Sequence, residues 1–140
     1  MSDGTPIVFS LDQAGEVAMK LLDASAGKKI WLFSGEPGAG KTTLIKSITE
    51  KLGGDSSAVN SPTFAILNRY ETSSGPVFHF DLYRTKSIAE LLDIGITEYL
   101  DSGEYCFIEW PERLGSLKPE DCFKISLAHL SDTTRRLIIS

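Results

Sequence analysis

Residues 35–42 read G-E-P-G-A-G-K-T and match in full the pattern G-x-x-x-x-G-K-[ST] of a phosphate-binding loop. Its glycines allow backbone conformations in which successive N–H groups point toward phosphate oxygens. Lys41 adds a positive charge for the β- and γ-phosphates, and the hydroxyl of Thr42 is suited to bind Mg²⁺. The pattern predicts that the chain binds a nucleoside triphosphate with Mg²⁺. The predicted contacts are Gly35, Pro37, Gly38, Ala39, Gly40, Lys41, Thr42 and Thr43.

Two acidic residues occupy positions, at the ends of predicted strands, where active-site carboxylates are often found. Asp81 follows the apolar residues V-F-H-F, and Glu109 follows Y-C-F-I, so each stands at the end of a predicted strand. Ligands of parallel sheets collect beyond the carboxyl ends of strands. Hydrolysis needs a metal carboxylate and a group that places the attacking water. We therefore predict Asp81, Glu109 and Lys41 as catalytic, and Thr42, Glu109 and Asp81 as metal ligands. For each acid the alternative is an ordinary surface carboxylate.

Three other side chains lie close to these positions in the sequence. Thr63, in the segment S-P-T, is suited to sense the γ-phosphate as part of a switch, although S-P-T is also an ordinary turn. His79 alternates with Asp81, and we interpret it as a packed, hydrogen-bonded histidine rather than a catalytic one. Trp110 is either a core residue or an aromatic side chain near the nucleotide, and the sequence leaves this open.

The elements around these residues predict an α/β fold. A strand over residues 28–34 enters the phosphate-binding loop, and a helix over 42–52 leaves it, which is the order that the loop pattern requires. The other predicted elements are a capped helix over 11–26, a hairpin of 64–72 and 77–83, short helices over 88–95 and 96–103, and strands over 104–110, 121–130 and 135–140. Together they predict a three-layer P-loop NTPase fold, with a mixed sheet that is antiparallel at its edges.

Composition limits the classes of function. At 140 residues the chain is expected to form one domain, residues 1–140, without a membrane span or a secretory signal, and we expect a cytoplasmic protein. Cys106 and Cys122 are expected to be reduced thiols in the core. The net charge of −5 argues against binding of nucleic acid by this chain alone, because phosphate backbones require a clustered basic surface.

Four segments, read in order, resemble one family. They are G-E-P-G-A-G-K-T, S-P-T, H-F-D-L-Y-R and I-E-W-P-E, at residues 35–42, 61–63, 79–84 and 108–112. This set resembles the bacterial TsaE (YjeE-type) ATPases of tRNA threonylcarbamoyladenosine biosynthesis, over essentially the whole chain. The last two segments are more specific than the loop, which many families share. One departure is Glu36-Pro37, where the family often has Asp-Leu.

The resemblance implies an ATPase, with ATP and Mg as cofactors, that acts with the proteins TsaD and TsaB. Together they transfer a threonylcarbamoyl group from its adenylate to N6 of the tRNA adenosine 3′ of the anticodon. This chain would support the complex through its nucleotide cycle and would meet tRNA only indirectly. The resemblance also implies nucleoside contacts from the two ends of the chain, for which the matching positions are Asp12 and Arg136.

Proteins with other functions use the same loop. A small-molecule kinase of the P-loop class usually carries an arginine-bearing lid, and the five arginines of this chain include no lid-like insertion. A GTPase-type switch would need the guanine-reading pattern N-K-x-D, which the sequence lacks. A nucleotide-binding regulatory subunit without hydrolysis cannot be separated from a slow ATPase at this level, and it stays open.

Overall fold

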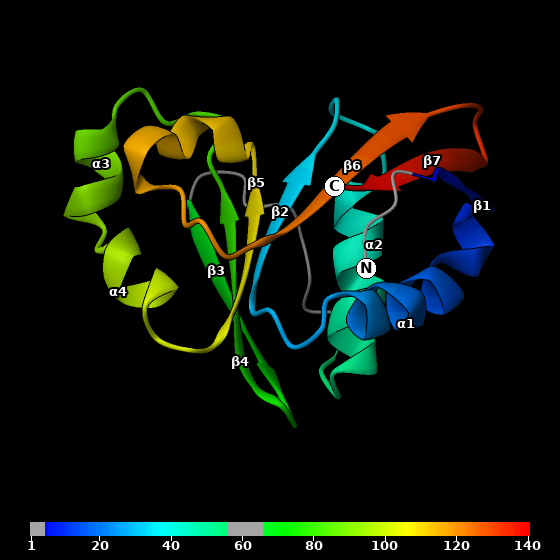
Figure 1. Cartoon of the computed structure of the whole chain (residues 1–140), viewed down its shortest axis with the longest axis horizontal. Helices are drawn as coiled ribbons and strands as arrows, with labels where there is room; N and C mark the ends of the chain where they lie inside the picture. Colours follow the sequence, from blue (N-terminus) through cyan, green and yellow to red (C-terminus); the bar gives the residue numbers. More distant parts are fainter. Residues whose placement is uncertain (1–4, 56–65) are drawn as a thin grey trace.

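A seven-stranded sheet runs through the middle of the molecule (Figure 1). The computed structural model describes residues 5–55 and 66–140. The strand order is β1-β7-β6-β2-β5-β4-β3. The strands are β1 (Ile7–Ser10), β2 (Ile30–Ser34), β3 (Leu67–Thr72), β4 (Gly75–Asp81), β5 (Tyr105–Glu109), β6 (Phe123–His129) and β7 (Thr134–Ile139).

The sheet is parallel at its centre and antiparallel at both sides. Strand β2 pairs in parallel with β5 and β6, and β4 pairs in parallel with β5. The hairpin of β3 and β4 is antiparallel, as are the pairs β6–β7 and β1–β7. The predicted mixed sheet with antiparallel edges is therefore confirmed.

Helices cover both faces of the sheet. Helices α1 (Ala14–Ala24) and α2 (Lys41–Lys51) lie on one face, and α3 (Ile88–Asp93), α4 (Ile96–Leu100) and the 3₁₀ segment η3 (Pro111–Leu117) lie on the other (Figure 1). Alternate residues of β2 serve the two faces: Trp31 and Phe33 pack under α1 and α2, whereas Leu32 packs toward α3 and α4. A strand buried on both faces reads as a continuous apolar run, as this one does. The predicted three-layer arrangement is confirmed.

Most element boundaries agree with the sequence-based expectation, and three features differ. The predicted helix over 11–26 begins as the 3₁₀ turn η1 (Leu11–Gln13), and the expected capping box forms, with the N–H of Ser10 donating to Oε1 of Gln13 at 2.8 Å. Strand β1 and segment η3 were not predicted. Strand β1 has four residues, and its partner β7 lies at the other end of the sequence, so no local pattern indicates the pairing.

The two cysteines also follow expectation. Cys106 and Cys122 are buried free thiols. Burial raises the pKa of the Cys106 thiol to about 12, so it stays protonated and unreactive at neutral pH. Within residues 5–55 and 66–140, no helix has the length and apolarity that a membrane crossing requires.

Candidate active site

The phosphate-binding loop connects the end of β2 to the start of α2. Gly35, Gly38 and Gly40 all have positive φ values, of 150°, 83° and 99°. Gly35 is constrained by its positive φ and also by its surroundings, because a Cβ there would lie 2.6 Å from the carbonyl oxygen of Leu127 in β6. The loop thus needs glycine for its conformation and for its close approach to β6. It ends on the first turn of α2, where backbone N–H groups have no acceptor within the helix.

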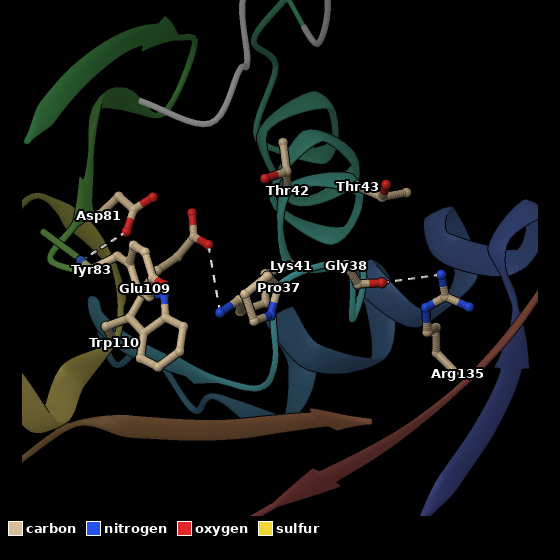
Figure 2. Close-up of a pocket in the computed structure, with 11 residues that line it drawn as sticks. Pro37, Gly38, Lys41, Thr42, Thr43, Asp81, Tyr83, Glu109, Trp110 and Arg135 are labelled. Atoms are coloured by element: carbon tan, nitrogen blue, oxygen red, sulfur yellow. Dashed lines mark hydrogen bonds and ion pairs between the residues drawn. The ribbon is translucent and has the colours of Figure 1, made fainter. Parts of the chain in front are cut away.

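A cavity of about 560 Å³ opens beside this loop (Figure 2). Its volume lies in the range of small-molecule sites, about 300–1,000 Å³. It lies beyond the carboxyl ends of the parallel strands, where such folds bind ligands. The residues that line it are Pro37, Gly38, Gly40, Lys41, Thr42, Thr43, Asp81, Tyr83, Glu109, Trp110 and Arg135.

The two predicted acids meet in this cavity. Asp81 and Glu109 are register partners at the ends of the neighbouring parallel strands β4 and β5. Oδ1 of Asp81 accepts a hydrogen bond from the N–H of Tyr83 at 3.1 Å. Burial raises the pKa of Asp81; the Tyr83 N–H opposes this shift, and the charge of Glu109 adds to it. Glu109 is buried, and its two oxygens have different partners: Oε2 faces Nε2 of His79 at 2.6 Å, and Oε1 faces Lys41.

Lys41 lies at the centre of the cavity wall with three partners. Its Nζ donates to the carbonyl oxygen of Gly35 at 2.6 Å and lies 4.0 Å from Oε1 of Glu109. The same ammonium is 4.6 Å from the centroid of the Trp110 ring, within range of a cation–π interaction. Figure 2 shows the carboxylate of Glu109 directed at the Lys41 amine. The lysine is therefore buried and held by other groups of the chain.

Two aromatic side chains complete one wall. The ring of Trp110 lies 4.8 Å from that of Tyr83, centroid to centroid, and both line the cavity. The backbone of Trp110 is left-handed, with φ 60° and ψ 54°, which is rare for a bulky residue and typical of functional sites. The sequence left the place of Trp110 open, and the structure puts it at the cavity. Tyr83 was not predicted as a site residue, although it lies in the segment H-F-D-L-Y-R.

On the loop's other side, Arg135 rather than Arg136 reaches the cavity. Arg135 is 7% exposed and donates to the carbonyl oxygens of Gly38 at 3.3 Å and Ser131 at 2.7 Å. Its buried Nε has no hydrogen-bond partner among the described residues. Arg136 is exposed, because adjacent residues of a strand point to opposite faces. The geometry thus gives no support to the prediction of Arg136 as a nucleotide contact and favours its neighbour.

Asp12, Ala39 and His79 lie in η1, in the phosphate-binding loop and in β4. Asp12 lies in η1, where its carboxylate accepts a hydrogen bond from the hydroxyl of Ser10, and the cavity lining does not include it. The prediction for Thr63 lies outside the described residues. Ala39 is buried in the loop, packed into the core beside α2. His79 is fully buried and hydrogen-bonded, as predicted.

The donor set of the cavity suits Mg²⁺. Thr42, Asp81 and Glu109 present hydroxyl and carboxylate oxygens, which are the ligands that this cation prefers. In the described part of the chain, no group of three or more His, Cys, Asp or Glu residues could hold a metal ion. Mg²⁺ is usually held by one or two carboxylates together with substrate phosphates and waters, so a set of this kind fits it.

The model of the family "Threonylcarbamoyl adenosine biosynthesis protein TsaE" matches residues 9–137. A similar protein of Rickettsia bellii, named tRNA threonylcarbamoyladenosine biosynthesis protein TsaE, is 37% identical over 96% of this chain and 93% of its own. A protein of Haemophilus influenzae with the same name is 33% identical, over 91% of this chain and 81% of its own. The crystal structure of Bacillus subtilis YdiB superposes with a TM-score of 0.69, at 23% identity, over 99% of this chain and 86% of that one. This last likeness shows the P-loop fold.

Proposed function

The chain belongs to the TsaE family of tRNA threonylcarbamoyladenosine biosynthesis, and from this premise we propose that it binds ATP with Mg²⁺ and slowly hydrolyses it. One observation carries the proposal: Asp81 and Glu109, paired at the ends of two parallel strands, share a cavity with Lys41 and Thr42. Phosphoryl transfer depends mainly on positioning and charge stabilisation. These four residues are of the types that such catalysis uses.

We infer that the phosphates bind along loop residues 35–40 and the first turn of α2. Backbone N–H groups at a helix N-terminus favour negative charge there. Lys41 would exchange the carbonyl oxygen of Gly35 and the carboxylate of Glu109 for the β- and γ-phosphate oxygens. Arg135 would hold the loop through Gly38, and its free Nε–H is suited to an anionic or carbonyl oxygen of the nucleotide.

The two acids would have different tasks. Glu109 turns Oε1 into the cavity, so we assign it, with the Thr42 hydroxyl, to the metal ion. When bound, Mg²⁺ would neutralise the charge on the phosphate oxygens. Asp81 is half-buried with a raised pKa, and a raised pKa suits a carboxylate that orients the attacking water and accepts its proton.

We propose further that the way Lys41 is held contributes to a slow reaction. Its ammonium already has a carbonyl, a carboxylate and an aromatic ring as partners, and these contacts must be exchanged for phosphate. A partner protein that favours the exchanged state would therefore stimulate turnover. We propose TsaD and TsaB as those partners, with the chain in the cytoplasm and tRNA reached only through the complex.

The test is ATP hydrolysis by the purified chain, alone and with the TsaD–TsaB pair of the same organism. A rate that rises when the pair is added would support the proposal. An equal rate with and without the pair would overturn the partner assignment. Binding of ATP without hydrolysis in either sample would favour the regulatory-subunit alternative. Phosphate transfer to added small alcohols would favour the kinase alternative.

A further inference from the structure

Three buried side chains form a hydrogen-bonded chain across neighbouring strands. Tyr70 of β3 and His79 of β4 are joined by a 2.8 Å contact between Oη and Nδ1. His79 and Glu109 of β5 are joined by the 2.6 Å contact between Nε2 and Oε2. Each of the three residues is at most 4% exposed. This series of hydrogen bonds thus runs from the edge hairpin to the cavity, and both ring nitrogens of the histidine take part in it.

The carboxylate of Glu109 fixes the direction of its hydrogen bond with His79, and for a neutral imidazole the direction of the other bond follows. A Glu109 carboxylate that faces Lys41 has acceptor oxygens only, so the proton of the second contact belongs to Nε2 of His79. A neutral imidazole with its proton on Nε2 has an acceptor at Nδ1. Tyr70 then donates its hydroxyl proton to Nδ1. In this tautomer Nε2 donates to Glu109 while Nδ1 accepts from Tyr70.

We propose that His79, held in this tautomer by Tyr70, is a positioning residue for the metal-binding carboxylate. By occupying Oε2 of Glu109, it leaves Oε1 to face Lys41 and the cavity. Hydrogen bonds to a ligating group fix its orientation and commonly change metal affinity by about 10- to 100-fold when removed. The inference rests on the proposed role of Glu109 as a Mg²⁺ ligand.

Two substitutions of the same histidine separate positioning from packing. In His79→Gln the amide nitrogen occupies the ε position and can still donate to Glu109. In His79→Asn the amide reaches only the δ position, toward Tyr70, and no donor faces the carboxylate. Val77→Ala is the matched packing control: Val77 is fully buried two residues earlier on the same strand face and is the register partner of Tyr70. The substitution removes core volume beside the three residues and leaves all their hydrogen-bonding groups in place.

The measurement is Mn²⁺ binding by electron paramagnetic resonance, with a non-hydrolysable ATP analogue at saturation. We expect His79→Asn to raise the Mn²⁺ dissociation constant by about tenfold or more. His79→Gln should restore most of this affinity, and Val77→Ala should keep the wild-type value. Binding of metal-free analogue should be the same in all four proteins. Wild-type Mn²⁺ affinity in His79→Asn, or an equal loss in Val77→Ala, would overturn the proposal.

Tyr70→Phe keeps the test decisive if His79→Asn does not fold. It removes one hydroxyl and leaves the ring in place, so Nδ1 can take the proton and Nε2 can lose it. Mn²⁺ affinity should then fall, by less than in His79→Asn, and an unchanged affinity would contradict the proposal. Failure of the proposed function is a separate result, since the wild-type protein would then bind no Mn²⁺ with the analogue.

Discussion

At the residue scale, Asp81 lies in surroundings that oppose its ionisation. Its carboxylate is half-buried next to a second acid, and burial is the largest cause of its raised pKa. The raised pKa makes the charged form less stable in the folded chain than in the unfolded one. A residue held at such a cost is typical of active sites.

The first prediction concerns this residue. Below its ordinary pKa of 3.8, Asp81 is protonated in both states and carries no penalty; stability is lost as the pH rises through the raised folded pKa. Asp81→Asn should therefore raise the melting temperature of the nucleotide-free chain at neutral pH, and the gain should shrink as the pH falls toward 3.8. Asparagine also keeps the acceptor for the Tyr83 N–H. Calorimetry over a pH series measures this.

The rate of ATP hydrolysis should fall by about 100-fold or more in Asp81→Asn, as is typical when a general base is removed. Asp132→Asn is the control, because Asp132 is exposed between β6 and β7 and away from the cavity. It should leave both stability and rate unchanged. A lower melting temperature in Asp81→Asn at neutral pH would contradict the account of this carboxylate.

The second prediction separates binding from hydrolysis at Glu109. Glu109→Gln keeps the side-chain volume and removes the charge that we assign to the metal site. ATP binding should remain detectable by isothermal titration, while Mg²⁺-dependent hydrolysis falls to the background. Hydrolysis at the wild-type rate in this variant would remove Glu109 from the site.

At the element scale, the loop between β2 and α2 is fixed by its contact with β6. Gly35 and Gly38 both have positive φ, but they differ in surroundings. A Cβ on Gly38 meets nothing within 4 Å, whereas a Cβ on Gly35 would lie 2.6 Å from the carbonyl oxygen of Leu127. Gly38 thus reports the cost of a left-handed backbone alone, whereas Gly35 combines a backbone that glycine almost alone adopts with a clash against β6.

The third prediction uses this pair. Gly38→Ala should lower the free energy of unfolding by about 1–2 kcal/mol, the cost of a left-handed residue with a side chain. Gly35→Ala should cost more, because either the loop or β6 must move. Urea unfolding of the nucleotide-free variants measures both. Equal losses would show that the contact with β6 does not constrain the loop.

Local patterns in the sequence predicted the elements that build the site. The loop motif and the two strand-end acids each occupy a short run of residues, and parallel pairing then brings Asp81 and Glu109 together. The choice between Arg135 and Arg136 is different. Neighbouring residues of a strand face opposite ways, so the choice depends on the pairing of β7 with β6 and β1, which no run of adjacent residues encodes. The left-handed backbone of Trp110 was likewise not indicated by its residue type.

At the scale of the whole molecule, the negative net charge of the chain disfavours direct binding to tRNA. The net charge is −5, and no run of basic residues in the sequence is longer than a pair such as Arg135-Arg136. Binding to a nucleic acid backbone depends on the number of phosphates that cations neutralise. This charge is consistent with the proposal that other proteins hold the tRNA.

The fourth prediction follows from this charge. The chain alone should not retain labelled tRNA in a filter-binding assay at physiological salt, with or without ATP and Mg²⁺. A mixture of the chain with the TsaD–TsaB pair should retain it. Retention of tRNA by the chain alone would contradict this account of its charge.

The central claim is that the cavity beside α2 binds ATP through Lys41, and isothermal titration with ATP at constant Mg²⁺ tests it most directly. The control is Lys46→Ala, which removes an exposed lysine from the same helix. We predict that wild type and Lys46→Ala bind one ATP with similar affinity. Lys41→Ala, shown to be folded by circular dichroism, should bind at least about tenfold more weakly, because a charged hydrogen bond to phosphate is lost. Equal affinity in all three proteins, or no binding by the wild type, would contradict the account.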